Sequence, residues 1–150
     1  MRLKKRRSGI RGGRRCEMPA KDKLHDAAVR ALLKDGWRIV SDSQTIKFNG
    51  RTLYLDIVAE KEGRRIVVEV KGDAFDEMAE LEKAMGQYLL YRFVLARQYP
   101  DLTPFLAAPQ GAFGRIFGTS QIDGPDFAAQ FNLNFLVFDS KKEEIIQWIQ

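Results

Sequence analysis

One segment, residues 65–71, constrains the fold of this chain more than any other, and it reads Arg-Ile-Val-Val-Glu-Val-Lys. Its centre, Ile66 to Val68, is a near-continuous β-branched run, which is typical of a strand buried on both faces. A strand of that kind needs neighbouring strands at its edges and packed layers above and below. The segment therefore predicts a central β-sheet, in which the charged Glu69 and Lys71 close a buried strand.

Apolar periodicity and turn residues predict the other elements. Helices are expected from Asp22 to Gly36 and from Phe75 to about Gln98, with a short helix or turn at 113–117. Strands are expected at 37–40, 45–48, 52–59, 65–71, 102–108, 132–138 and 144–150, with hairpin turns at 49–50 and 62–63. We thus predict an α/β (α+β) fold with a mixed central β-sheet flanked by helices.

The positive charge of the chain is concentrated at its start. Residues 1–17 contain eight Lys and Arg and one Glu, whereas the remaining 133 residues contain 17 Lys and Arg and 19 Asp and Glu. We predict a basic disordered leader over 1–17 and a single domain over 18–150. The leader either follows phosphate groups nonspecifically or precedes a natural start at Met18. The domain itself is near neutral, which disfavours tight nonspecific DNA binding and favours delivery to DNA by a partner.

The chain shows no sign of export or of membrane insertion. Cys16 is the single cysteine, so neither an internal disulfide nor a multi-cysteine zinc site can form. No apolar stretch is long enough for a membrane helix, and the basic start is not followed by the apolar segment of a secretory signal. We predict a cytoplasmic protein with no membrane span.

Three charged residues on neighbouring strands are the most informative group. Glu69 and Lys71 are two positions apart and so project from the same side of their strand, while Val70 points into the opposite layer. A hairpin through residues 62–63 can bring Asp56 alongside them. Charge at the end of an apolar strand is costly unless it is compensated, and a metal ion would compensate it.

The chemistry of these groups suits phosphodiester hydrolysis. The carboxylates of Asp56 and Glu69 are hard oxygen ligands for Mg²⁺ or Mn²⁺. The metal would polarise a phosphate and lower the pKa of a bound water, and Lys71 would position that water or stabilise negative charge in the transition state. The alternative is that an isolated Glu-x-Lys at a strand end is only solvated or salt-bridged.

The segments LDIVAE and RRIVVEVK resemble the core signature of the PD-(D/E)xK nuclease superfamily, with Leu55 in place of the proline. The resemblance implies that Asp56 and Glu69 bind the metal and that Lys71 assists catalysis. In such nucleases the first helix often presents a Glu or His toward the metal, which makes His25 a candidate third metal ligand. Equally, His25 can be a helix cap or a surface residue.

On the long predicted helix, Gln87 and Tyr91 are four residues apart and share one face. They resemble the Gln-x-x-x-Tyr element of RecB-like nucleases, in which the Gln helps to hold the phosphate or the metal-bound water. The resemblance implies a catalytic role for Gln87 beside Asp56, Glu69 and Lys71. It also implies contacts from Lys71, Gln87 and Tyr91 to nucleic acid. Without the resemblance, the pair would be ordinary helix surface or core.

A longer resemblance covers nearly all of residues 18–149. The blocks MPAKDKLHDAAVRALLKDGW, TIKFNGRTLYLDIVAE, IVVEVK, ELEKAMGQYLLYR and LNFLVFDSKKEEIIQWI are similar to the XisH family of element excision controlling factors. The resemblance implies a cyanobacterial-type factor that acts with a site-specific recombinase and a companion protein, XisI, to excise a DNA element. The leader and residues 72–74 depart from the family pattern. Many nucleases of the superfamily are dimers, and a homodimer is a further hypothesis.

Three functions follow from these resemblances. The first is a Mg²⁺- or Mn²⁺-dependent DNA endonuclease that assists site-specific excision. The second is a catalytically silent regulator that binds DNA or a partner on a nuclease fold, because a fold does not determine a function. The third is one member of a toxin–immunity-like pair with the companion protein. The first depends on whether Asp56, Glu69 and Lys71 converge in space.

Overall fold

The computed structural model describes residues 20–118 and 122–150. The predicted basic leader, residues 1–17, lies outside the described residues. In chain order, the elements are α1 (Ala20–Lys34), β1 (Arg38–Ser41), β2 (Gln44–Phe48), β3 (Arg51–Leu55), β4 (Ile57–Lys61), β5 (Arg64–Val70), the short 3₁₀ helix η1 (Asp73–Asp76), α2 (Met78–Gln98), β6 (Leu102–Pro109), α3 (Gln110–Phe117), α4 (Gly124–Phe131), β7 (Phe135–Asp139) and β8 (Glu144–Ile149).

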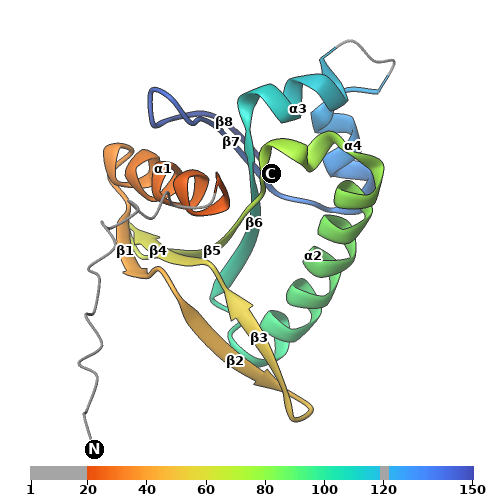
Figure 1. Ribbon diagram of the computed structural model, residues 1–150. Helices are drawn as coiled ribbons and strands as arrows, with labels where there is room; N and C mark the ends of the chain where they lie inside the picture. Colours follow the sequence, from red (N-terminus) through yellow and green to blue (C-terminus); the bar gives the residue numbers. More distant parts are fainter. Residues whose placement is uncertain (1–19, 119–121) are drawn as a thin grey trace, which may run out of the picture.

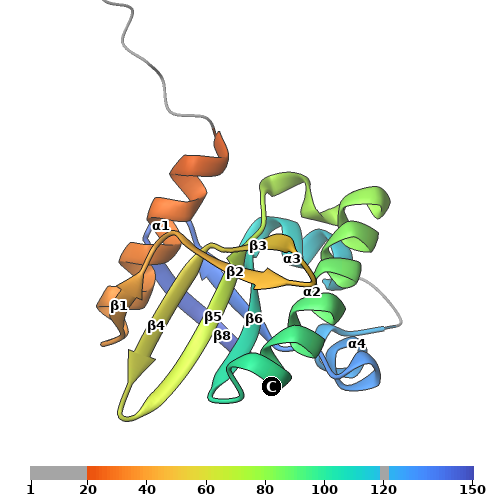
Figure 2. The same ribbon diagram turned by 90° about the horizontal axis from the view of Figure 1, so that it is seen from below.

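A mixed six-stranded β-sheet forms the centre of the molecule, in the order β1-β4-β5-β6-β7-β8 (Figures 1 and 2). The strands β5, β6 and β7 are parallel to one another, whereas the β1–β4, β4–β5 and β7–β8 pairs are antiparallel. β5 therefore has a partner on each side, and its residues from Ile66 to Val70 are all buried. The predicted mixed central sheet with flanking helices is confirmed.

The side chains of β5 alternate between two layers. Ile66, Val68 and Val70 pack in one cluster with the apolar side of α1. Val67 points to the opposite face and packs in a cluster with Tyr91 of α2. Figure 1 shows α1 on one side of the sheet and α2 on the other. Because the strand repeats every two residues, the side chains that follow Val67 in phase, those of positions 69 and 71, are directed toward α2.

The helix ends and hairpin turns follow the predicted signals. Gly36 has a φ of 88°, a left-handed conformation that ends the first helix. The residues at 49–50 and 62–63 all have positive φ values between 48° and 78°, as type I′ hairpins require. The predicted short helix at 113–117 is part of α3. Among the described helices, none combines the length and apolar composition needed to cross a membrane.

The prediction of one strand over 52–59 is wrong. The chain leaves its strand conformation at Asp56, which separates β3 from β4. β3 pairs only with β2 in a separate two-stranded sheet, whereas β4 pairs with β1 and β5 in the main sheet. The alternating apolar pattern continues through the break because Leu55 and Ile57 are both buried, although in different clusters. Asp56 thus lies at a junction and not within a strand.

A second difference is α4, which was not predicted, so that the strand expected to begin at residue 132 begins at Phe135. The helix carries ordinary end signals. The side chain of Asp123 caps its first turn by accepting a hydrogen bond from the Asp126 amide at 2.7 Å, and Pro125 is the second residue of the helix. Asn132 ends it in the left-handed conformation, with a φ of 53°. These end signals could have identified the helix from the sequence.

Two adjacent leucines of α1 test the packing of this helix on the sheet. Leu32 is fully buried, whereas Leu33 is 51% exposed. Leu32→Ala should lower the free energy of unfolding by about 2–5 kcal/mol, because it removes buried methyl groups and leaves a cavity. Leu33→Ala, the same chemical change one position later, should cost less than about 1 kcal/mol. Urea denaturation followed by circular dichroism measures both, and equal losses would contradict the described position of α1.

Candidate active site at the end of β5

Glu69 is the centre of the site. It lies on the α2 side of β5, and of the polar and charged residues whose burial the structure describes, only Glu69 is buried, with 8% of its surface exposed. Lys71 follows on the same side of the chain, and its ammonium nitrogen lies 3.7 Å from a carboxylate oxygen of Glu69. Val70 packs on the opposite face, against α1. The structure therefore brings Glu69 and Lys71 together as the alternation of a strand predicts.

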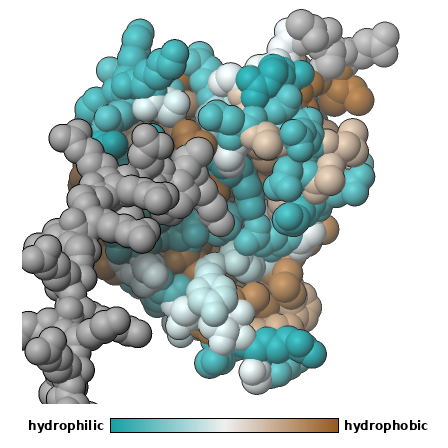
Figure 3. Space-filling view, in the orientation of Figure 1, coloured by the Kyte–Doolittle hydropathy of each residue, from teal (hydrophilic) through white to brown (hydrophobic). Residues whose placement is uncertain are grey.

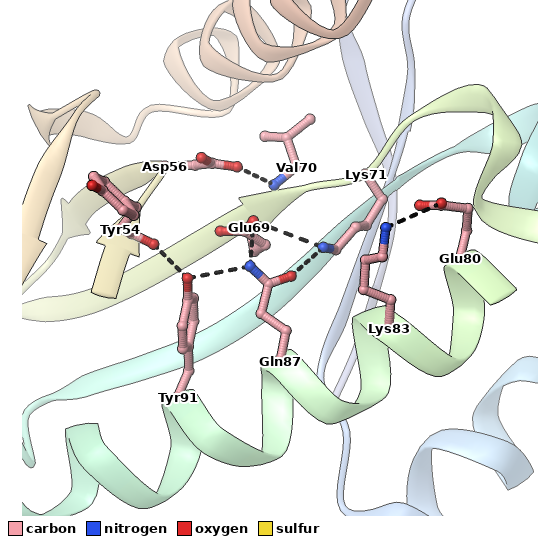
Figure 4. Close-up of polar contacts among 9 residues, drawn as sticks. All are labelled: Tyr54, Asp56, Glu69, Val70, Lys71, Glu80, Lys83, Gln87 and Tyr91. Atoms are coloured by element: carbon pink, nitrogen blue, oxygen red, sulfur yellow. Dashed lines mark hydrogen bonds and ion pairs between the residues drawn. The ribbon is translucent and has the colours of Figure 1, made fainter. Parts of the chain in front are cut away.

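The side chain of Gln87 on α2 joins these two residues (Figure 4). Its amide oxygen accepts a hydrogen bond from the Lys71 ammonium group at 2.5 Å, and its amide nitrogen donates to the Glu69 carboxylate at 3.0 Å. A single amide can serve an acid and a base in this way because it carries both an acceptor and a donor. Gln87 on α2 thereby bridges Glu69 and Lys71 at the end of β5.

Tyr91, one turn further along α2, continues this network. Its hydroxyl accepts a hydrogen bond from the Gln87 amide at 3.2 Å and donates to the backbone carbonyl of Tyr54 at 2.6 Å. The second bond ties α2 to the end of β3. Burial raises the pKa of Tyr91 above its ordinary value of 10.0; the hydrogen bond with Gln87 lowers that pKa, and the charges of Glu69 and Asp56 raise it.

Asp56 reaches the same end of β5 by a different route. Its carboxylate accepts a hydrogen bond from the backbone amide of Val70 at 3.0 Å. The β4–β5 register begins at Ile57 opposite Val68, so the chain has left the sheet before it could pair with Val70. The Asp56 side chain takes the place of a strand partner for that amide. The break between β3 and β4 is therefore what brings the Asp56 carboxylate next to the residue between Glu69 and Lys71.

His25 lies on α1, partly exposed, and it makes no hydrogen bond or ion pair with any described residue. Its neighbour Leu24 lines the pocket beside the site. Within the described part of the chain, no three His, Cys, Asp or Glu side chains lie close enough together to hold a metal ion. The role of His25 as a third metal ligand stays a prediction.

Asp56 and Glu69 fit Mg²⁺ or Mn²⁺ in the kind and number of their donors. Both offer carboxylate oxygens, which these cations prefer, and Mg²⁺ is often held by only one or two carboxylates with water and substrate phosphate completing its shell. The burial of Glu69 adds to this, because a buried carboxylate gains more from a nearby cation than an exposed one does.

An open pocket of about 500 Å³ lies against the site and gives it access to solvent. Glu69, Lys71 and Gln87 contribute to its wall, and residues 72–74, at the start of η1, form another part of it. Lys83 also lines the pocket, with its ammonium nitrogen 3.4 Å from Glu80. The sequence interpretation missed Lys83, although the spacing 83, 87 and 91 places all three residues on one face of a helix.

Comparisons with known proteins find the chain similar to one family. A protein-family model described as XisH protein matches residues 18–146. The crystal structure of an XisH family protein from Nostoc punctiforme PCC 73102 has 38% sequence identity and a TM-score of 0.75, covering 86% of this chain and 100% of that one. The crystal structure of an fdxN element excision controlling factor protein from Anabaena variabilis has 34% identity and a TM-score of 0.75, covering 86% and 99%. The comparison with curated proteins gave no match.

Tyr91→Phe tests the hydroxyl that links Gln87 to β3. The pKa of the Tyr91 hydroxyl is higher in the folded protein than in the unfolded chain, so the protonated hydroxyl favours folding. This contribution to stability is complete below pH 10.0 and is lost as the pH rises through the raised pKa. The unfolding free energy of the wild type should therefore fall more steeply above pH 10.0 than that of the variant. Below that pH the variant should be less stable by about 1–3 kcal/mol, because the Gln87 and Tyr54 groups lose a buried partner.

Tyr54→Phe is the control for this measurement, because the Tyr54 side chain is 67% exposed and should contribute within about 0.5 kcal/mol. Denaturation curves at a series of pH values, with the ultraviolet absorbance of phenolate as a second readout, compare the three proteins. Parallel pH dependence of wild type and Tyr91→Phe would show that Tyr91 ionises as easily in the folded protein as in the unfolded chain.

Proposed function

The chain belongs to the XisH family, and from this premise we propose that it is an element excision controlling factor with a nuclease site of the PD-(D/E)xK type. In this proposal the site hydrolyses DNA phosphodiester bonds with Mg²⁺ or Mn²⁺ and assists the excision of a DNA element. One observation carries the proposal. Glu69 is a buried carboxylate with an amine, Lys71, on its own strand and a second carboxylate, Asp56, bonded to the amide of the residue between them.

Asp56 and Glu69 are the residues that would hold the cation. When bound, it would polarise a phosphate group and lower the pKa of a water molecule. The two carboxylates come from different parts of the sheet, the β3–β4 junction and the end of β5, and both are anchored. Asp56 is held by the Val70 amide and Glu69 by the Gln87 amide. Anchored ligands need little reorganisation, which favours electrostatic stabilisation of a developing charge.

Lys71 and Gln87 would act on the substrate. The Lys71 side chain lines the pocket with 16% of its surface exposed, so a phosphate oxygen that enters the pocket meets its ammonium group. Gln87 holds that ammonium group beside Glu69 and prevents it from turning into solvent. Tyr91 in turn holds Gln87. The three residues form a rigid base on which the phosphate can be oriented.

In this proposal, partner proteins bring the chain to its DNA substrate. Residues 18–150 carry 17 Lys and Arg against 19 Asp and Glu, so the domain as a whole does not attract the DNA backbone strongly. The solved relative from Anabaena variabilis is an element excision controlling factor. By this relationship, an XisI-like companion protein and a site-specific recombinase are the proposed partners, and they would bring the nuclease site to the ends of the element.

A second function is a catalytically silent regulator that binds DNA or its companion with the same surface. The observation in its favour is that Glu69, Lys71, Gln87 and Tyr91 are already linked to one another through hydrogen bonds and an ion pair. A network of this kind stiffens the end of β5 without any cation. The two functions differ in whether the charge of Glu69 is needed for excision or only for structure.

Cleavage of DNA tests the first function. The wild-type protein should nick supercoiled or branched DNA in the presence of Mg²⁺ or Mn²⁺. Glu69→Gln and Lys71→Met, which keep side-chain volume and remove the charge, should each reduce the rate about a hundredfold or more. Lys141→Met and Glu144→Gln, the same changes at exposed positions of the β7–β8 hairpin, should leave it unchanged. Thermal melts establish that each variant is folded.

Two results would contradict the nuclease function. One is the absence of nicking by the wild type with either cation, and the other is equal nicking by Lys71→Met.

An excision assay separates the two functions. The wild type and Glu69→Gln are expressed with the companion protein and the recombinase, and joined DNA ends are counted. Loss of excision by Glu69→Gln, with unchanged co-purification of the companion protein, is the result expected for the nuclease, because the carboxylate charge is lost while the binding surface is kept. Full excision by this variant would support the regulator.

A further inference from the structure

The outer face of α2 carries large apolar side chains that the rest of the chain covers only in part, as where the Phe93 ring meets the edge of Phe48 on β2. Leu89, Leu90 and Phe93 are 44%, 41% and 46% exposed. The inner face of the same helix is separately filled, because Ala84, Tyr88 and other residues of α2 are buried against the sheet. In Figure 3, apolar surface lies among hydrophilic groups on the side of the molecule where Figure 1 shows α2. A helix with apolar side chains on two opposite faces normally buries both of them against other protein surfaces.

Gly86 lies on this outer face, one turn before Leu89 and Leu90. A methyl group added to it would meet no atom of the chain within 4 Å, so no close contact within the chain requires a glycine. In the interior of a helix, glycine costs about 1 kcal/mol relative to alanine. A glycine that is costly for the chain itself, on an exposed apolar face, is suited to the close approach of another chain.

The charges at the two ends of this face are opposite. Glu82 is exposed one turn before Gly86, and Arg97 is exposed one turn after Phe93, with its guanidinium group 3.6 Å from the centre of the Phe93 ring. The order along the face is therefore acid, glycine, two leucines, phenylalanine, base. The point between Leu89 and Leu90 is the midpoint of this order, since Gly86 and Phe93 are equally far from it, as are Glu82 and Arg97.

From this arrangement we infer that a second copy of the chain docks on the outer face of α2, with the two helices antiparallel about a two-fold axis between Leu89 and Leu90. Such an axis places Leu89 of each chain against Leu90 of the other. It also places the Phe93 ring over the partner's Gly86, and Glu82 opposite the partner's Arg97. Each of these contacts occurs twice, as a two-fold interface requires.

A second copy of the chain fits this face better than another occupant. When the helix of the second copy runs antiparallel to the first, the acidic end of each face meets the basic end of the other, and the apolar centres meet. DNA does not fit it, since the centre is apolar and Glu82 would repel phosphate. Phe131 of α4, 43% exposed, extends the apolar area beside the helix, and Arg92 joins α4 to α2 through the Phe131 carbonyl. Gln87 and Tyr91 point inward, so the dimer would leave both candidate active sites in place.

Charge reversal tests the antiparallel pairing. The full chain is studied by sedimentation over a range of concentrations, without DNA or any other protein. The wild type should be a dimer. Glu82→Arg places Arg opposite Arg at both ends of the interface, and Arg97→Glu places Glu opposite Glu, so each variant alone should have a dissociation constant raised about tenfold or more. An equimolar mixture should form dimers again, because both ends then pair Arg with Glu.

Lys141→Glu, the same charge change in the β7–β8 hairpin, is the matched control and should remain a dimer. A wild type that is monomeric at every concentration would overturn the inference, including the case in which the monomer binds a companion protein through α2. Dimers that persist in both single variants would also overturn it. So would a mixture of the two variants that fails to associate.

Gly86→Gln is a second test of the interface, and its melting temperature separates a loss of dimerisation from a loss of folding. Position 86 is exposed, a Cβ atom there meets no atom of the chain within 4 Å, and glutamine favours the helix over glycine, so the variant should melt at or above the temperature of a monomeric Arg97→Glu protein. Its side chain would occupy the space of the partner's Phe93, and the protein should sediment as a monomer. A fully dimeric Gly86→Gln would contradict the close approach of the two helices.

Discussion

The site depends on one buried interaction, the pairing of the Glu69 carboxylate with Lys71 through the amide of Gln87. A carboxylate at the end of a sheet of valine, isoleucine and phenylalanine loses most of its hydration, and this loss is tolerated only when charged and polar partners replace the water. Gln87 meets this need from a helix that is distant along the chain. Gln87 can do so because it lies on the face of α2 that packs on the sheet, beside buried Ala84, Tyr88 and Tyr91.

The break at Asp56 is the second structural requirement. If β3 continued into β4, the Val70 amide would pair with a strand and the side chain at position 56 would lie within a ladder. Instead the chain turns away to form the β2–β3 hairpin, and the Asp56 carboxylate accepts the Val70 N–H. The Tyr91 hydroxyl binds the Tyr54 carbonyl just before the break. Polar contacts thus link the end of the hairpin, α2 and the end of β5, as Figure 4 shows.

The two faces of the long helix α2 have different surroundings. Its inner face supplies Gln87 and Tyr91 to the site and packs on the sheet, whereas its outer face presents Leu89, Leu90 and Phe93 to solvent. Helix geometry makes this division possible, because residues three and four apart share a face while their neighbours point elsewhere. In the inferred dimer the same element positions the site and joins two chains, so the two candidate sites would be held in a defined relation to each other.

The local patterns of the sequence determined much of this protein. The β-branched run at 66–68 determined a buried central strand, the Asn-Gly pair at 49–50 and the glycine at 63 determined two hairpin turns, and the two-residue spacing of Glu69 and Lys71 determined that they share a side. Only the tertiary structure decided that residues 52–59 divide between two sheets, that Asp56 binds the Val70 amide, and that Gln87 bridges the acid and the amine. The reason is physical. Periodicity and turn preferences act between residues close in the chain, whereas the contact of Asp56 with Val70 and that of Gln87 with Glu69 join polar groups 14 and 18 residues apart.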